Sequence, residues 1–493
     1  MSATPRTVVV LPVSRTDASQ IARRVIRPPG EAATPKLVRD LFGENYIPGT
    51  FMLSERKERP AFLWDEEDGE YEGWMRRVTR SHVEAIARGG FLPSGIDAGS
   101  LTKVEDAVLE ILEVRLGSGR TLCDSVTNQQ VTDIVWRILK TVFLGNPYAS
   151  CHLLREVNDL GRRCATRILQ RHRPDDPISA LKWSVVAGAV GADIKARYTA
   201  AGPSPMREGA IIQIPGAPGE PEFETVGEEI ERRATQTFGI DCSDDFLRDV
   251  IGKSGEVSLL FFTDDYVETV FDLWAILTLL REKQNLQVTI VPKWGQQAND
   301  ASFEDVQELL ADPLFEDLRA MEGVRFHVAP NGPAGSGISA YELSPRILEA
   351  LRSVDVVLFK GARSFEMLQG VKKTAYFAFN VLHSYTETLT GLDATLGPSV
   401  LLRYEAGVPA FQDFRHRAER KATLASGRVV GLARMTALEY VEAIKSQQYA
   451  RFVCEGQDRN TASMALVERA KALNKTFAQL TLDHGCLPTT GVR

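Results

Sequence analysis

Apolar and polar residues follow two different rhythms along this chain, and the change falls near residue 245. Between 72 and 200 apolar residues recur at spacings of three and four, which predicts helices at 74–87, 103–114, 131–142, 153–170 and 178–196. From 247 onward, short apolar runs occur at 257–262, 288–291, 324–328, 354–359 and 376–379, and most are separated by helical patterns at 267–280, 303–310, 345–351 and 364–368. Strands that alternate with helices predict right-handed βαβ units and a mostly parallel sheet, an α/β fold.

This change of rhythm divides the chain into five predicted segments. They are an N-terminal extension with little core of its own, a helical domain, a Gly/Pro-rich linker with a connecting helix, a layered α/β domain and a C-terminal helical extension with a helix at 461–480. Their bounds are 1–70, 71–200, 201–244, 245–415 and 416–493.

Composition and charge exclude several classes of protein. The chain is 44% hydrophobic and 25% charged, as in ordinary globular proteins, and its net charge of −7 disfavours nucleic acid and anionic membranes as partners. It has no run of 18 apolar residues, and the apolar run at 8–13 is too short for a signal peptide. The six cysteines form no CxxC pair, which favours reduced thiols and a cytoplasmic protein. The sequence leaves the oligomeric state open.

The first candidate site lies where the run 257–262 ends in two adjacent carboxylates, Asp264 and Asp265. A predicted helix follows them directly. Open α/β sheets bind ligands outside the carboxyl ends of their strands, so these residues are candidates for holding a hard cation. The alternative is that one of them simply caps the helix, as Asp often does.

A second polar cluster follows the run 288–291. The strand is expected to end near Pro292, a short loop then carries Lys293, and Asn299 and Asp300 precede the next predicted helix. Asp300 or Ser302 would cap that helix. Lys293 is a candidate for binding an anion, with pairing to a neighbouring carboxylate as the alternative.

A third cluster follows the run 354–359, where Lys360, Gly361 and Arg363 precede a helix. Glycine permits close approach of the backbone, and a lysine and an arginine beside a helix N-terminus favour an anion. Together the three clusters would hold a divalent ion through oxygen ligands and place cations opposite it, which suits a phosphate ester. Oxygen ligands favour Mg²⁺, Mn²⁺ or a similar ion (Co²⁺, Ni²⁺, Fe²⁺) over structural zinc.

The same segments resemble the damage-control phosphatases, the metal-dependent family first catalogued as domain of unknown function eighty-nine. DDYVETVFD at 264–272 resembles its DNAGExxFD motif, QQANDASFEDVQEL its NDATxED stretch and FKGARSFEML its KGQGNFETL stretch. NPYASCHLLREVNDL and DPISALKWSVVAGAVGAD resemble two upstream motifs in the same order, so the resemblance covers roughly 146–370.

The resemblance implies a helical N-terminal domain packed on a Rossmann-like α/β domain, and hydrolysis of small phosphorylated metabolites such as sugar phosphates. It implies that Asp264, Asp265 and Asp300 bind the metal, and that Glu268 orients the metal site or its water. Lys360 with the Gly361 backbone would hold phosphate.

Four positions depart from the family pattern: Asp265 and Ser364 replace asparagines, Val267 replaces a glycine and Ala189 replaces an asparagine. With Arg363 in place of a glycine, they predict an altered substrate pocket and a specialised member of the family, acting in a biosynthetic pathway. Ser364 and Arg363 would line that pocket. Two alternatives stay open: a different metal-assisted reaction (lyase, isomerase or group transfer) on a secondary metabolite, and a non-catalytic binding protein.

Overall fold

A seven-stranded sheet forms the centre of the computed structural model, which describes residues 34–43, 46, parts of 102–114, 152–198, 223–236, 238–295, 300–332, 339–368, 371–381, 398–404, 421–423 and 429–431. The strand order is β1-β7-β6-β5-β2-β3-β4. Their bounds are β1 Phe238–Asp241, β2 Val257–Phe262, β3 Leu286–Val291, β4 Phe326–Val328, β5 Val356–Lys360, β6 Ala375–Asn380 and β7 Ser399–Tyr404. All pairs are parallel except β6 with β7, so the predicted mostly parallel sheet is confirmed.

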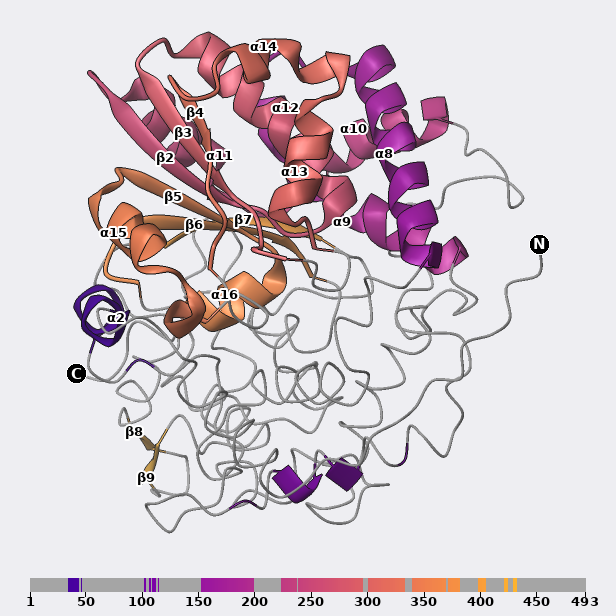
Figure 1. Cartoon of the computed structure of the whole chain (residues 1–493). Coiled ribbons are helices and arrows are strands. Elements are labelled where there is room, and N and C mark those ends of the chain that lie inside the picture. Colours follow the sequence, from indigo (N-terminus) through magenta and orange to yellow (C-terminus); the bar gives the residue numbers. More distant parts are fainter. Residues whose placement is uncertain are drawn as a thin grey trace.

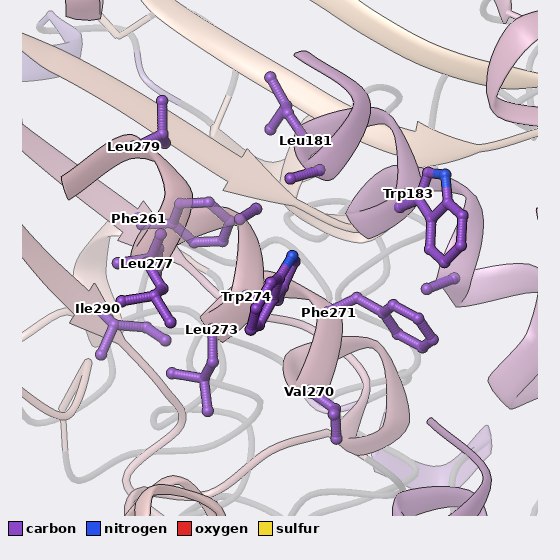
Figure 2. Packing of buried hydrophobic residues seen from close by; sticks show 14 of the residues in the cluster. Leu181, Trp183, Phe261, Val270, Phe271, Leu273, Trp274, Leu277, Leu279 and Ile290 are labelled. Carbon is purple, nitrogen blue, oxygen red and sulfur yellow. The ribbon is translucent and has the colours of Figure 1, made fainter. Parts of the chain in front are cut away.

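One face of the sheet is covered by helices from two parts of the chain. These are α8 (His152–His172), α9 (Pro177–Tyr198), α10 (Phe223–Gln236), α12 (Tyr266–Glu282), α13 (Phe303–Leu310) and α14 (Glu316–Ala320) (Figure 1). The helix α12 is buried from Tyr266 to Leu280 because it contacts the sheet and is also packed against α8, α9, α13 and α14. Trp274 and Phe271 of α12 lie between Trp183 of α9 and Phe261 of β2 in this core (Figure 2). A helix enclosed by protein needs no polar face, which explains its apolar sequence.

The other face is covered by α15 (Pro345–Ser353), α16 (Ala362–Leu368) and the N-terminal helix α2 (Thr34–Phe42) (Figure 1). Side chains alternate along β2, so that Leu259 and Phe261 join the first core and Leu260 and Phe262 join the second. A strand buried on both faces is typical of a sheet with helix layers on each side, which is the three-layer α/β fold predicted from the sequence.

Helix boundaries follow capping residues. Asp265 caps α12, Ser302 caps α13 in a capping box with Asp305, and Ser344 with Pro345 begins α15. The predicted helices at 153–170, 178–196, 267–280, 303–310, 345–351 and 364–368 are present within a few residues. No helix in the described ranges combines the length and apolarity needed to cross a bilayer.

The structure also adds elements that the hydrophobic pattern did not indicate. Strand β1 lies at 238–241, ahead of the predicted start of the α/β domain at 245, and β7 joins the same sheet. The short elements α11 (Ser243–Leu247), η4 (Arg248–Gly252), η5 (Pro313–Phe315) and η6 (Ala340–Glu342) connect longer ones. A hairpin of β8 (Lys421–Thr423) and β9 (Val429–Gly431) lies in the predicted C-terminal helical extension.

Some predicted elements fall outside the described residues. They are the helices at 74–87, 131–142 and 461–480, the run 8–13 and most of the helix at 103–114.

The order of the strands marks where a ligand would bind. From β2 the chain proceeds outward to β3 and β4 and then returns to form β5 on the opposite side of β2. The strand order therefore reverses between β2 and β5, and open α/β sheets bind ligands at the carboxyl ends of two such strands. Asp264 follows β2 by two residues and Gly361 directly follows β5, so both lie at this switch point.

Candidate functional site at the switch point of the sheet

The backbone of Gly361 comes very close to the carboxylate of Asp264. A Cβ atom on Gly361 would lie 2.2 Å from Asp264 Oδ2 and 2.4 Å from its Cγ. Gly361 also has a φ of +85°, a conformation that favours glycine. This position therefore requires glycine for two reasons, and β5 approaches β2 closely enough to bring the third polar cluster beside the first.

The two adjacent aspartates have different surroundings. The Asp265 carboxylate caps α12 by accepting a hydrogen bond of 2.9 Å from the Val267 N–H. The Asp264 side chain accepts no hydrogen bond within the described part of the chain, and it is only partly exposed. Burial raises the pKa of Asp264 above its usual range, although Lys293, Lys360 and Arg363 oppose this shift. Of the two, Asp264 has the carboxylate that remains available to a cation.

The segment that starts at Asp300 lies directly beside this pair. The Ala301 N–H donates to the Asp264 carbonyl oxygen at 2.8 Å, and Asp300 forms a β-bridge with Asp265. Burial raises the pKa of Asp300 to about 7, with repulsion from Asp264 and Asp265 adding to the effect. Lys293 and Arg363 act in the opposite direction. Ser302, rather than Asp300, caps α13, so the Asp300 carboxylate is not used as a helix cap.

Lys293 is held tightly at the end of β3. Its N–H donates to the Ala301 carbonyl at 3.0 Å, and its own carbonyl accepts from the Phe303 N–H at 2.8 Å. Its ammonium lies 3.7 Å from Asp300 Oδ2, and the side chain is almost completely buried. Lys293 thus directly contacts Asp300, a member of the acidic group.

Lys360 lies deeper than the sequence indicated. Its side chain is 0% exposed, and its ammonium pairs with Glu268 and, at 2.9 Å, with Asp272 Oδ1. It also donates to Ser184 of α9, at 3.0 Å to the carbonyl and 2.9 Å to Oγ. Burial alone would lower the pKa of Lys360, but Asp272 and Glu268 outweigh it and raise that pKa. In this arrangement Lys360 joins α9, α12 and β5, and its predicted contact with phosphate stays a prediction.

Glu268 is therefore part of a buried ionic cluster. Burial raises its pKa well above the usual range, and the nearby carboxylates of Asp272 and Asp264 add to this against the attraction of Lys360. Asp272 is fully buried, and its Oδ1 accepts from Ser184 Oγ at 2.6 Å. Two carboxylates share one ammonium here, so their mutual repulsion and their burial disfavour the ionisation of both at once. The predicted role of Glu268 at a metal or its water stays a prediction.

The remaining predicted residues come from the first turn of α16 and from the loop after β3. Arg363 is partly buried and close enough to oppose the rise in pKa of Asp264 and Asp300. Ser364 is buried. Asn299 lies outside the described residues, so its predicted contact with substrate is not described.

Two asparagines at other strand ends were not singled out from the sequence. Asn331, three residues after β4, is buried and accepts a hydrogen bond of 2.8 Å from the Trp294 N–H. Asn380 ends β6, donates to the Val185 carbonyl at 2.8 Å and accepts from Ser399 Oγ at 2.7 Å. Two features of the sequence could have pointed to them. Asn331 belongs to an Asn-Gly pair, and Asn380 is the polar residue that ends an apolar run.

The donors present suit an oxygen-preferring ion. No group of three or more His, Cys, Asp and Glu side chains in the described ranges has the arrangement of a metal site. Mg²⁺, however, is usually bound through one or two carboxylates and completed by water and substrate phosphate. Asp264 and Asp300 provide two carboxylates that repel each other, and a divalent ion between them would relieve that repulsion. The residues therefore fit such an ion in donor type.

The fold and this site define a three-layer α/β domain with an acidic centre, flanked by cations, at the switch point. Residues 216–384 match the family model described as the Damage-control phosphatase ARMT1-like domain. A segment of 154 residues is 28% identical to Damage-control phosphatase PH1575 of Pyrococcus horikoshii and covers 31% of this chain and 48% of that protein. The chain thus aligns with about half the length of this curated relative.

The crystal structure of that same Pyrococcus horikoshii protein, described as a DUF89 family protein, is also similar to this chain. It has a TM-score of 0.49 and 18% sequence identity, and the match covers 67% of this chain and 95% of the other. The match of 216–384 to the family model and the 28% identity of the curated relative make this domain similar to damage-control phosphatases, as a divergent relative. The resemblance noted in the sequence is thereby confirmed.

Proposed function

We propose that this chain is a phosphatase that hydrolyses a small phosphorylated metabolite, such as a sugar phosphate, with the help of a divalent metal ion. One observation carries the proposal: at the switch point of the sheet, the Lys293 ammonium lies 3.7 Å from Asp300 Oδ2, and both Lys293 and Arg363 oppose the rise in pKa of Asp264 and Asp300. The family match over 216–384 supports the same class of reaction. We further propose a cytoplasmic location and a role in a specialised biosynthetic pathway.

Asp264 and Asp300 would hold the ion, with Asp265 beside them as the cap of α12. When bound, such an ion polarises the phosphoryl oxygens and activates water for attack. Mg²⁺, Mn²⁺, Co²⁺, Ni²⁺ and Fe²⁺ all accept oxygen ligands.

Lys293 and Arg363 would bind the phosphoryl oxygens and balance the charge of the group being transferred. Both come from positions fixed by backbone contacts, Lys293 through the Ala301 and Phe303 hydrogen bonds and Arg363 through the start of α16. Gly361 lets β5 approach Asp264 without a side chain between them. The chain would therefore contribute mainly position and charge, which is what phosphoryl transfer requires.

The test is phosphate release from a panel of sugar phosphates with each of the divalent ions above. Asp264→Asn should lower kcat/KM by about 100-fold or more, because one charged ligand at the metal is lost. Asp312→Asn is a matched control, since Asp312 caps η5 by accepting from the Leu314 N–H and asparagine caps equally well. Calorimetric titration with Mn²⁺ gives a readout that does not depend on activity.

Equal activity in the wild type and Asp264→Asn would disprove the proposed site. A protein that binds Mn²⁺ yet releases no phosphate from any ester would instead favour a different metal-assisted reaction. The absence of both metal binding and activity would favour a non-catalytic role.

A further inference from the structure

The N-terminal segment contributes a buried tyrosine to the α/β domain. Tyr46 is 4% exposed and follows α2, whose apolar side chains pack in the core between α15 and the sheet. The ring of Tyr46 lies 4.6 Å from that of Phe42 and 5.5 Å from that of Tyr341, measured between centroids. Tyr46 and α2 lie far upstream of residues 216–384, the segment that matches the family model, and are not part of that match.

The hydroxyl of Tyr46 forms two hydrogen bonds to distant parts of the chain. It donates to the Met367 carbonyl at 2.6 Å and accepts from the Ala340 N–H at 3.1 Å. Met367 belongs to α16 and Ala340 begins η6. One buried hydroxyl therefore joins two elements that are not neighbours in the sequence.

The first of these elements carries one side of the candidate site. The helix α16 begins at Ala362, immediately after Gly361, and Arg363 lies in its first turn. With only seven residues, α16 places Met367 about one turn after Arg363. The bond from Tyr46 to Met367 therefore restrains the position of Arg363.

The second element leads to the opposite side of the site. Shortly after η6, the Ser344 N–H donates to the Asn331 carbonyl at 2.7 Å. The Asn331 side chain accepts from the Trp294 N–H, and its own N–H donates to the Pro292 carbonyl at 2.9 Å. These two bonds enclose Lys293. The backbone at this point is tight as well, because a Cβ on Gly332 would lie 2.5 Å from the Glu342 carbonyl oxygen.

We propose that Tyr46 is a positioning residue for the candidate site: its hydroxyl sets the spacing between Arg363 and Lys293, the two cations of that site. The inference rests on the proposed function, in which these cations bind the phosphoryl group. It makes the segment around α2, outside the family match, a functional part of the phosphatase domain.

Removal of the hydroxyl alone separates this role from simple packing. Tyr46→Phe keeps the ring contacts with Phe42 and Tyr341 and leaves the Met367 carbonyl and the Ala340 N–H without their partner. Val38→Ala is the control, because it creates a cavity under α2 without touching the hydroxyl.

The experiment uses the full chain and measures kcat and KM for the best sugar phosphate, the inhibition constant of inorganic phosphate, and amide hydrogen exchange. Tyr46→Phe should raise KM and the inhibition constant about 3- to 10-fold, the effect of one lost buried hydrogen bond, with kcat changed less than about twofold. Exchange in α16 and in residues 340–344 should become faster. Val38→Ala should lower the melting temperature and leave both constants unchanged.

Unchanged KM and inhibition constants in an active Tyr46→Phe protein would overturn the inference, whatever happens to its stability. Equal increases in Val38→Ala would overturn it too, because loosened packing would then explain the effect. A wild-type protein that neither binds inorganic phosphate nor releases it from esters would refute the proposed function itself, and that result is distinct from the other two.

Discussion

The side chain of Val267, in the first turn of α12, occupies the space that Gly161 leaves free on α8. A Cβ atom on Gly161 would lie 2.3 Å from Val267 Cγ2, far inside van der Waals contact. Val267 stands where the family motif has glycine, so the departure from the motif is matched by a glycine on the helix that packs against it. The substitution therefore fills a helix contact and does not by itself change the adjacent carboxylates.

Gly161→Ala should destabilise the protein by about 1–3 kcal/mol, because the added methyl group overpacks this contact. Val267→Ala in the same chain should remove most of that cost. A double-mutant cycle measured by urea unfolding tests the pair, and a coupling energy near zero would show that the two positions do not pack as described.

Lys360→Met should cost about 3–5 kcal/mol, because it leaves Glu268 and Asp272 buried without their cation. The control is Lys253→Met, which removes a half-exposed ammonium 2.5 Å from Asp355 and should cost less than about 1 kcal/mol. Chemical denaturation at neutral pH measures both. Similar small losses in the two variants would contradict the buried cluster.

Gly361→Ala should lower phosphatase activity by about 100-fold, since the new methyl group must displace the Asp264 carboxylate or the β5 backbone. Gly255→Ala provides a matched control: Gly255 has a φ of +81°, close to that of Gly361, but a Cβ there would meet nothing within 4 Å. Both variants strain the backbone by a similar amount. Equal activities of the two would mean that the approach of Gly361 to Asp264 has no catalytic importance.

The stability of the metal-free protein should fall as pH rises from about 4 to about 7. The pKa of Asp300 is raised from 3.8 to about 7 in the folded protein, so its contribution is fully present below the unfolded value. It is lost as pH rises through the folded value, because the unfolded chain releases this proton more readily. Urea unfolding in the presence of a chelator should show that the free energy of unfolding depends less on pH in Asp300→Asn than in the wild type. Parallel profiles for the two proteins would disprove the shift.

Local features of the sequence were sufficient to predict the strand ends that form the site. Asp264 and Asp265 follow an apolar run and precede a helix, and Lys360 and Gly361 repeat this arrangement at the end of β5. Such signals are contained within a few neighbouring residues, so they can be recognised without knowledge of tertiary contacts.

The partners of Lys360 could not be predicted in the same way. Asp272 is 88 residues away in the chain and Ser184 is 176 residues away, and only the packing of α9 and α12 brings them together. The strand β7 was not predicted for a related reason. Its pairing with β1 and β6 depends on tertiary contacts, which the local sequence does not show. Tyr46 gave no local sign of its two distant hydrogen bonds.

The position of β7 between β1 and β6 has a consequence for synthesis of the protein. β1 ends at Asp241, yet its only partner in the described sheet begins at Ser399, so a nascent chain carries an unpaired strand while the intervening residues leave the ribosome. Until then β6 also presents an open edge with Phe377 and Phe379, the kind of edge that promotes aggregation. Translation that stops before β7 would therefore yield a product in need of a chaperone.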